Sequence, residues 1–183
     1  MRPRASAFIA TSLDGYIARP DGSIDWLNEA QDLIPDGEDC GYHAFMATVD
    51  AIVMGRHTFE QVLNFEAWPY DAIPVQVMSR ATVAVPAPLA AGVHVHQGTA
   101  ESLVDVLASK GFRQLYVDGG LTSQGFLRGG LLDEITITVV PILLGAGRPL
   151  FGQLGREIDL TLMHSRAYEF GFVQSTYRVD AGG

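Results

Sequence analysis

Three short apolar runs, at residues 51–54, 75–78 and 114–117, constrain the fold of this chain more than any other feature. The run at 51–54 is continuous rather than alternating, which is typical of a strand covered on both faces of a parallel sheet, and we expect the other two to be buried strands as well. Helical patterns follow the first and third runs, at 58–63 and about 122–127, and a further helix is predicted at 100–110. This order of strands and helices predicts an α/β domain with a mostly parallel central sheet flanked by helices.

The C-terminal part of the chain has a different pattern. Residues 134–140 alternate threonine with apolar residues, and two further strands are predicted at 161–168 and 173–179, separated by a turn at Gly171. Consecutive strands joined by short turns predict antiparallel pairing at this edge of the sheet. The remaining elements that we expect are one helix at 37–49 and short strands at 7–11, 16–18, 83–85 and 93–96.

Composition limits the classes of protein to which the chain can belong. Its 183 residues, 48% of them hydrophobic, predict a single domain over 1–183. The net charge of −9 argues against nucleic-acid binding, and the apolar runs are too short for a membrane helix. Cys40 is the only cysteine, which excludes an intrachain disulfide, so we expect a cytoplasmic protein. We expect no metal, because His94 and His96 alternate on a predicted strand without a third ligand in view.

The segment from Gly55 to Thr58 is the first candidate binding site. A buried strand stops at Gly55 and a helix begins at once, so backbone N–H groups can point at an anion such as phosphate. Arg56 and His57 add charge and hydrogen-bond donors for a further phosphate. The alternative is a simple strand–helix turn with a solvated arginine and a capping Thr58.

Two further strand ends carry similar chemistry. Gly119 and Gly120 follow a buried strand and let the backbone approach a flat or charged ligand, while Thr122 and Ser123 offer hydroxyls and N–H groups. The alternative is an ordinary Gly–Gly turn with a Ser/Thr cap. Ser79 and Arg80 follow the strand at 75–78, and in a parallel sheet all three strand ends would gather at one edge. Arg80 taken alone is equally consistent with a solvated residue.

Four segments, taken together and in this order, resemble the dihydrofolate reductase fold. They are 11–18 (TSLDGYIA), 54–60 (MGRHTFE), 117–120 (VDGG) and 141–151 (PILLGAGRPLF). More narrowly, the chain resembles the reductase domain of bacterial riboflavin-biosynthesis deaminase-reductases and its stand-alone relatives, over about residues 8–179. The resemblance implies NADPH as the cofactor, hydride transfer to a heterocycle or its open-ring sugar, and a homodimer. It also implies a cis peptide bond between Gly119 and Gly120.

The resemblance also assigns roles to individual residues. The 2′-phosphate of NADPH would face Arg56, His57, Ser79 and Arg80. The pyrophosphate would be held by Gly55, Thr58, Gly119, Gly120, Thr122 and Ser123. The nicotinamide would lie near Ala10, Thr11 and Ile17. Asp14 matches an aspartate beside the family's active site, and Asp39 has about the spacing of the carboxylate that supports substrate protonation in dihydrofolate reductases. We therefore expect the proton to come from solvent or from one of these two catalytic candidates.

These roles leave several alternatives open. Asp39 could instead be a solvated acid at a helix start, and Trp26 could stack on a substrate ring or merely close the core. No deaminase domain precedes the resembling region, so we do not expect the bifunctional riboflavin enzyme. The main hypothesis is an NADPH-dependent reductase of a small pterin-like or pyrimidine-like compound. The rivals are a nucleotide- or flavin-binding module without catalysis and a dihydrofolate reductase proper.

A homodimer is the expected partner arrangement. The strand at 134–140 carries little charge on either side, and the segment 141–151 is apolar with one charge, at Arg148. Left exposed, this segment would form an apolar patch that a second copy could cover. The alternative is that it folds back over the protein's own sheet.

Overall fold

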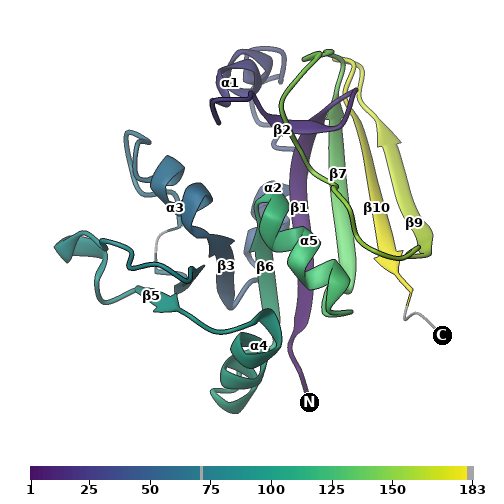
Figure 1. The fold of residues 1–183 in the computed structure, drawn as a ribbon. Helices are drawn as coiled ribbons and strands as arrows, with labels where there is room; N and C mark the ends of the chain where they lie inside the picture. Colours follow the sequence, from purple (N-terminus) through teal and green to yellow (C-terminus); the bar gives the residue numbers. More distant parts are fainter. Residues whose placement is uncertain (71, 181–183) are drawn as a thin grey trace.

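The computed structural model describes residues 1–70 and 72–180. Its centre is an eight-stranded sheet in the order β5-β4-β3-β6-β1-β7-β10-β9 (Figure 1). The first six strands in this order run parallel, and β10 and β9 pair antiparallel at the C-terminal edge, as the sequence predicts. Their bounds are β1 Arg4–Ser12, β3 Ala51–Gly55, β4 Val75–Met78, β5 Val93–His96, β6 Gln114–Asp118, β7 Glu134–Val140, β9 Leu160–Ala167 and β10 Val173–Val179.

Helices cover both faces of this sheet. Two helices, α4 (Ala100–Ser109) and α5 (Gly120–Arg128), bury Leu103, Leu107 and Phe126 against one face. On the other face, α3 (Arg56–Val62) buries Phe59 against β3 and β4, beside the short helix α2 (Tyr42–Met46). Continuous apolar strands are therefore required in the middle of the sheet, because both of their faces are excluded from water.

A separate core cluster lies at one end of the molecule. The seven-residue helix α1 (Asp25–Gln31) contributes Trp26 and Ala30, which pack with Val140, Tyr168 and Phe172. The sequence pattern did not predict α1, because only these two of its residues are buried and so short a helix shows no periodicity.

Two predicted elements differ from the structure. The helix expected at 37–49 is regular only over α2, because Cys40 and Gly41 have left-handed backbone conformations (φ +53° and +81°) that no helix can continue through. The strand expected at 83–85 is not formed. Because β5 pairs with β4 along its whole length, that edge of β4 is not available to residues 83–85, and Pro86 follows them without a backbone donor.

The segment 141–151 packs largely on its own chain. A two-residue strand, β8 (Arg148–Pro149), pairs with β2 (Tyr16–Ala18) in a small second sheet, and the side chain of Leu150 is buried in the main core. Ile142 and Leu144 pack against the Trp26 cluster, whereas Leu143 stays exposed. Within the described residues, no helix is long and apolar enough to cross a membrane.

Candidate active site

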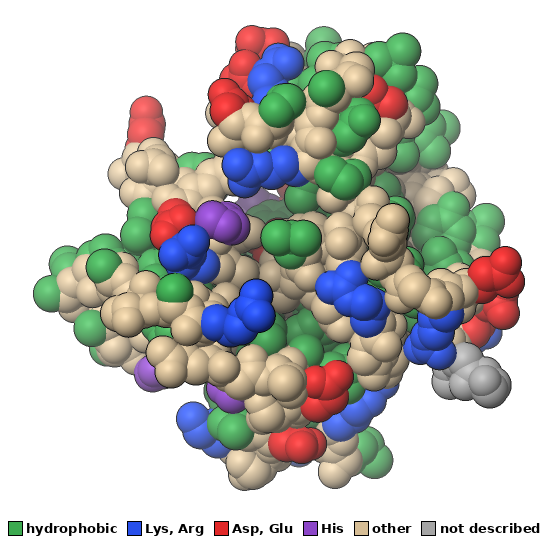
Figure 2. Space-filling model, in the orientation of Figure 1, with side chains coloured by type: hydrophobic (Ala, Val, Ile, Leu, Met, Phe, Trp, Pro, Cys, Tyr) green, Lys and Arg blue, Asp and Glu red, His purple; other side chains and the backbone are tan. Residues whose placement is uncertain are grey.

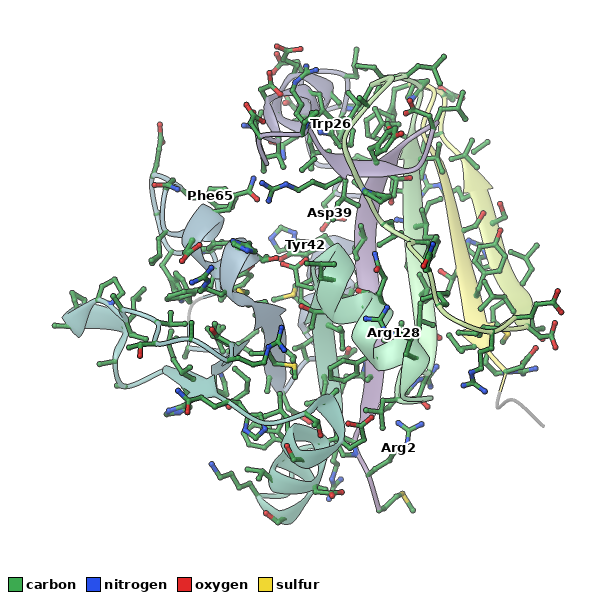
Figure 3. All side chains as sticks on the ribbon, in the orientation of Figure 1. Arg2, Trp26, Asp39, Tyr42, Phe65 and Arg128 are labelled. Atoms are coloured by element: carbon green, nitrogen blue, oxygen red, sulfur yellow. The ribbon has the colours of Figure 1, made fainter. Side chains whose placement is uncertain are left out.

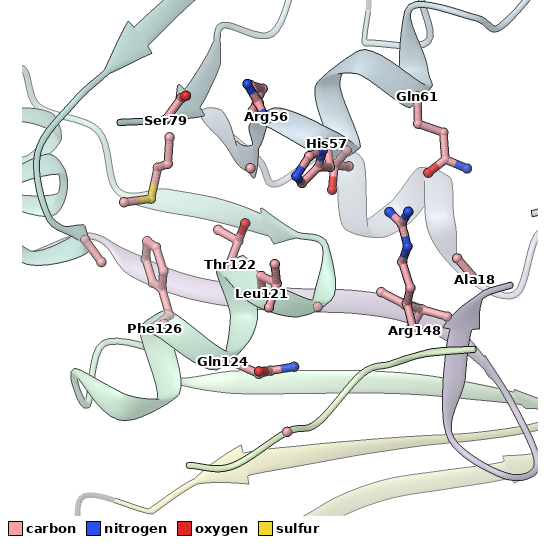
Figure 4. Close-up of a pocket in the computed structure, with 18 of the residues that line it drawn as sticks. Ala18, Arg56, His57, Gln61, Ser79, Leu121, Thr122, Gln124, Phe126 and Arg148 are labelled. Atoms are coloured by element: carbon pink, nitrogen blue, oxygen red, sulfur yellow. The ribbon is translucent and has the colours of Figure 1, made fainter. Parts of the chain in front are cut away.

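A cleft of about 900 Å³ opens where β3, β4 and β6 end (Figure 4). These three strands are parallel neighbours, so their carboxyl ends meet at one edge of the sheet, with Met54 opposite Asp118 and Gly55 opposite Met78. Figure 2 shows basic and histidine side chains around the hollow in this face. Nine of the predicted cofactor residues line this cleft: Ile17, Gly55, Arg56, His57, Thr58, Ser79, Arg80, Gly120 and Thr122.

The first turn of α3 forms one wall of the cleft. Glu60, one helical turn on, lies between the Arg56 and His57 side chains, with 3.6 Å to Arg56 Nε and 3.4 Å to His57 Nδ1. All three side chains remain more than a third exposed, so these contacts orient Arg56 and His57 without burying them. Both side chains are therefore available to an anionic ligand in the cleft.

Ser79 and Arg80 lie on the same side of the cleft as Arg56. The Ser79 hydroxyl donates to the Ala81 carbonyl at 2.8 Å and closes a tight turn after β4. Arg80 forms no ion pair with a carboxylate in the described part of the chain. The structure thus brings together all four residues that the sequence grouped around a 2′-phosphate.

The glycine pair after β6 forms the floor between α3 and α5. Gly119 has φ +91°, and a Cβ atom there would collide with Thr58 Oγ1. At Gly120, a Cβ atom would lie 2.9 Å from the Pro149 carbonyl oxygen and 3.0 Å from Ile17. Glycine is therefore required at Gly119 by its positive φ and the Thr58 side chain, and at Gly120 by the nearby carbonyl oxygen of Pro149.

The peptide bond between Gly119 and Gly120 is trans, so the prediction of a cis bond is wrong for this structure. The positive φ of Gly119 alone turns the chain from β6 into α5. A cis bond without proline would cost about 2.5–4 kcal/mol, and the turn is made without it.

The N-terminus of α5 is free to bind a ligand. No side chain caps it, whereas Thr99 caps α4 by accepting a hydrogen bond from the Ser102 amide. Thr122 Oγ1 lies near Gly55, where a Cβ atom would approach it to 3.1 Å. The hydroxyl oxygen of Ser123 is fully buried and has no hydrogen-bond partner among the described residues.

Two of the remaining predicted cofactor residues, Ala10 and Thr11, are not among the residues that line the cleft. Ala10 and Thr11 are in the middle of the sheet on β1, paired with Thr138 and Val139 of β7, and the side chain of Thr11 is buried. Ile17, in contrast, lies in the cleft lining, on β2.

Both predicted catalytic aspartates lie outside the residues that line the cleft. Asp14 accepts hydrogen bonds from the Ser12 hydroxyl and from the amides of Leu144 and Gly145, and the Ser12 bond is the main cause of its lowered pKa. Its carboxylate stays ionised at neutral pH and ties the segment 141–151 to the β1–β2 turn. Asp14 thus has the chemistry of a loop anchor rather than of a proton donor.

Asp39 caps the start of α2. Its carboxylate accepts bonds from the His43 and Gly41 amides and contacts His43 Nδ1 at 2.6 Å. Figure 3 labels Asp39 on the ribbon. The His43 amide is the main cause of the lowered pKa of Asp39. This geometry is that of the helix-start acid that the sequence left open as the alternative.

Trp26 closes the core instead of forming a wall of the cleft. Its side chain is 1% exposed, and Nε1 has no partner among the described residues. The neighbouring Asp25 forms an ion pair with Arg19 at 2.6 Å.

Two residues of the cleft were not singled out by sequence reasoning. Gln61 lies one helical turn after His57 and faces the same side of α3, a spacing that could have identified it. Arg148 reaches the cleft from β8, on the side opposite α3 (Figure 4). Its position depends on the β2–β8 pairing, of which the sequence gives no sign.

Asp118, at the end of β6, is a further residue that sequence reasoning left without a role. Its carboxyl group is half-buried at the end of the same strand that leads into Gly119. Desolvation raises its pKa, although the Gly119 amide and the hydroxyls of Tyr116 and Tyr70 act in the opposite direction. The Tyr42 pKa is raised to about 12 by burial and by Asp118. The end of β6, beside the glycine pair but outside the cleft lining, therefore carries a carboxyl group that can hold a proton at higher pH than an exposed aspartate.

No group of three or more potential metal ligands from His, Cys, Asp and Glu occurs in the part of the chain that the structure describes.

Comparison with known proteins places this geometry in a family. Residues 5–173 match the model of the RibD C-terminal domain. The uncharacterized protein YwjB of Bacillus subtilis (strain 168) is 32% identical over 170 residues, which cover 92% of this chain and 94% of YwjB.

Solved structures show the same architecture. A protein of Shewanella sp. PV-4 named for riboflavin biosynthesis superposes with a TM-score of 0.90 at 41% identity, covering 98% of this chain and 99% of the other. A pyrimidine reductase-like protein of Corynebacterium diphtheriae gives a TM-score of 0.73 at 17% identity, with 98% and 93% coverage, and so supports the fold alone.

Proposed function

Because this chain belongs to the RibD C-terminal domain family, with its dihydrofolate reductase-like fold, we propose that it is an NADPH-dependent reductase of a small pterin-like or pyrimidine-like heterocycle. The observation that carries the proposal is the convergence of Arg56, His57, Ser79 and Arg80 at one end of a cleft whose floor is the Gly119–Gly120 pair.

The residues of the cleft fit NADPH. Arg56 and Arg80 are charge-assisted donors for a 2′-phosphate, and no acidic residue follows β4 to repel it. The glycine floor has space only for backbone, and the uncapped start of α5 supplies N–H groups for a pyrophosphate. NADPH, when bound, supplies the hydride, and the protein's part is to orient it and exclude water.

Asp118 is the group that we propose as the source of the proton. Asp118 is the last residue of β6, on the side of the sheet where Tyr42, Tyr70 and Tyr116 lie. Burial raises its pKa. A carboxyl group with a raised pKa keeps its proton to a higher pH than an exposed aspartate does, and can donate it to a ring nitrogen or oxygen of the acceptor. Asp14 and Asp39, whose pKa values are lowered, are poorer donors.

The test is NADPH binding followed by NADPH consumption. We expect the purified protein to bind NADPH more tightly than NADH, and to oxidise it in the presence of pterin-like or pyrimidine-like compounds, including open-ring sugar derivatives. Rapid oxidation with dihydrofolate would favour a dihydrofolate reductase proper. Binding without turnover across a broad panel of heterocycles would favour a nucleotide-binding module, and failure to bind NADPH would refute the proposal.

A further inference from the structure

Arg148 brings a positive charge into the cleft from a segment that the cofactor assignment does not use. The backbone of Arg148 pairs with Ala18 across the small β2–β8 sheet, and its side chain extends from there into the cleft. Figure 4 shows it between Ala18 and Leu121, pointing toward Gln61 and His57 of α3. Ser79 and Arg56 lie at the other end of the same view, so Arg148 is separate from these two predicted 2′-phosphate residues, whereas His57 lies between them and Arg148.

The guanidinium of Arg148 is held in place, but its charge is not neutralised. Its one side-chain hydrogen bond in the described structure runs from Nη2 to the Asp21 carbonyl oxygen at 3.1 Å. No carboxylate of the described residues forms an ion pair with it. Gly22 leaves room for it, because a Cβ atom there would lie 2.9 Å from three of the guanidinium atoms.

The surroundings of Arg148 attract anions. Three arginines and His57 line the described cleft, and Glu101 is the only acidic residue among them. The Glu101 carboxylate lies beside Gly129, just beyond the C-terminal end of α5, where a Cβ atom would approach it to 2.6 Å. An unpaired arginine held by backbone contacts, in a chain of net charge −9, is arranged to bind an oxyanion.

We propose that Arg148, with His57 and Gln61 across the cleft, forms a second anion subsite that binds a phosphate or carboxylate group. This inference rests on the proposed function for the identity of the bound molecules. The oxyanion has two possible sources, the pyrophosphate of the cofactor or an acidic group on the substrate, and both are recognised by the same guanidinium chemistry. If the second source holds, the substrate is an anionic heterocycle rather than a neutral one.

The experiment compares Arg148→Met with Arg148→Lys and with Arg128→Ala. Arg128 is a matched control, because its Nη1 also donates to one backbone carbonyl, that of Gln153, but it lies at the opposite end of α5 and outside the cleft. The three variants and the wild type are titrated with NADPH, and then with inorganic phosphate in the presence and absence of saturating NADPH. Thermal unfolding of each variant checks that it is folded.

Two results support the subsite and distinguish its sources. A loss of NADPH affinity of about tenfold or more in Arg148→Met, partly restored in Arg148→Lys, assigns the oxyanion to the cofactor. Unchanged NADPH affinity, with phosphate binding to the NADPH complex lost only in Arg148→Met, assigns it to the substrate. Equal affinities of Arg148→Met, Arg128→Ala and the wild type for both NADPH and phosphate would overturn the proposal, as would absence of phosphate and NADPH binding in the wild type. The wild type could also bind phosphate through Arg148 while failing to bind NADPH. That result would refute the proposed function and leave the subsite standing.

Should Arg148→Met unfold, Gly22→Ala gives a second route. An added methyl group at Gly22 would displace the guanidinium while keeping its charge, at some cost from the positive φ of +96°. We expect Gly22→Ala to weaken binding of whichever ligand, NADPH or phosphate, Arg148 contacts, and unchanged binding of both ligands would count against the subsite.

Discussion

The hydroxyl oxygen of Tyr70 lies 3.4 Å from a carboxylate oxygen of Asp118, although the two residues are 48 positions apart in the sequence. Tyr70 lies in the loop after α3 and Asp118 at the end of β6, so the contact joins this loop to the end of the strand. Burial raises the pKa of both groups. Burial therefore favours the protonated carboxyl group of Asp118, whereas the hydrogen bond from the Tyr70 hydroxyl stabilises the carboxylate and opposes this shift.

This relationship predicts how activity and stability depend on pH. A raised pKa means that the folded state binds the Asp118 proton more tightly than the unfolded state does, so the stabilising contribution is full below the ordinary value of 3.8 and is lost as pH rises through the folded-state pKa. We expect kcat to fall as pH rises through the folded-state pKa of Asp118, because the carboxyl group has then lost the proton that it would donate. Asp118→Asn should flatten the stability profile and lower kcat on the order of a hundredfold or more.

NADPH affinity provides the control for Asp118. We expect Asp118→Asn to bind NADPH as the wild type does, because the side chain is not among those lining the cofactor cleft. A full kcat with an unchanged pH profile in this variant would exclude Asp118 as the proton source.

Arg56→Ala should separate the two nicotinamide cofactors. The guanidinium is 37% exposed and shares Glu60 with His57, so solvent screening places its contribution at the low end of a charge-assisted bond, about 1.5 kcal/mol or roughly tenfold in Kd. We expect this loss for NADPH and no change for NADH. Arg113→Ala, at the start of β6 and away from the cleft, is the matched control. Equal weakening of both cofactors would show that Arg56 does not contact the 2′-phosphate.

Two glycines of the same segment should respond in opposite ways to alanine. Gly119 combines a positive φ of +91° with ψ of 146°, a region that only glycine occupies readily, so Gly119→Ala should lower the free energy of unfolding by about 1–3 kcal/mol. Gly125 lies in the middle of α5, and nothing lies within 4 Å of a Cβ atom there. Gly125→Ala should therefore raise the free energy of unfolding by about 0.5–1 kcal/mol. Urea unfolding measures both, and similar values for the two variants would contradict the model of the glycine floor.

Asp14 should stabilise the protein only while it is ionised. Its pKa is lowered, chiefly by the Ser12 hydroxyl, so its contribution is present above the ordinary value of 3.8 and is lost as pH falls through the folded-state pKa. We expect Asp14→Asn to lower Tm at neutral pH, because the amides of Leu144 and Gly145 lose a charged acceptor. The difference in Tm from the wild type should shrink in acid, and a constant difference across pH would rule out this role.

Features of the fold and the site that depend on residues close together in the sequence could be predicted, whereas features that depend on residues far apart in the sequence could not. The junctions β3–α3 and β6–α5 follow from contiguous residues, so Arg56, Thr58 and the glycine pair could be assigned to one edge of the sheet. Arg148 could not, because it reaches the cleft only through pairing with Ala18, on a strand of two residues. The raised pKa of Asp118 likewise depends on burial among tyrosines from other elements, which no local pattern encodes.

The homodimer stays a prediction, and we expect it to form through the C-terminal part of the sheet. The interior strand β7 pairs with β1 and β10 along both its edges, so it offers no free edge to a second copy. Among the described residues β9 is the edge strand on this side of the sheet, and its Leu162 and Met163 are 55% and 56% exposed. A long exposed edge strand with apolar side chains can pair with a strand of another chain, and two identical strands related by a twofold axis can hydrogen-bond to each other through their free backbone groups.

Light scattering at micromolar concentration tests this prediction. We expect a mass of two chains for the wild type and of one chain for the double variant Leu162→Glu, Met163→Lys, because charges on the facing strands would have to be buried. Val106→Glu, which alters a similarly exposed apolar residue on α4, should stay dimeric. A wild-type mass near one chain that does not change on concentration would show that the protein is a monomer and that β9 is solvated.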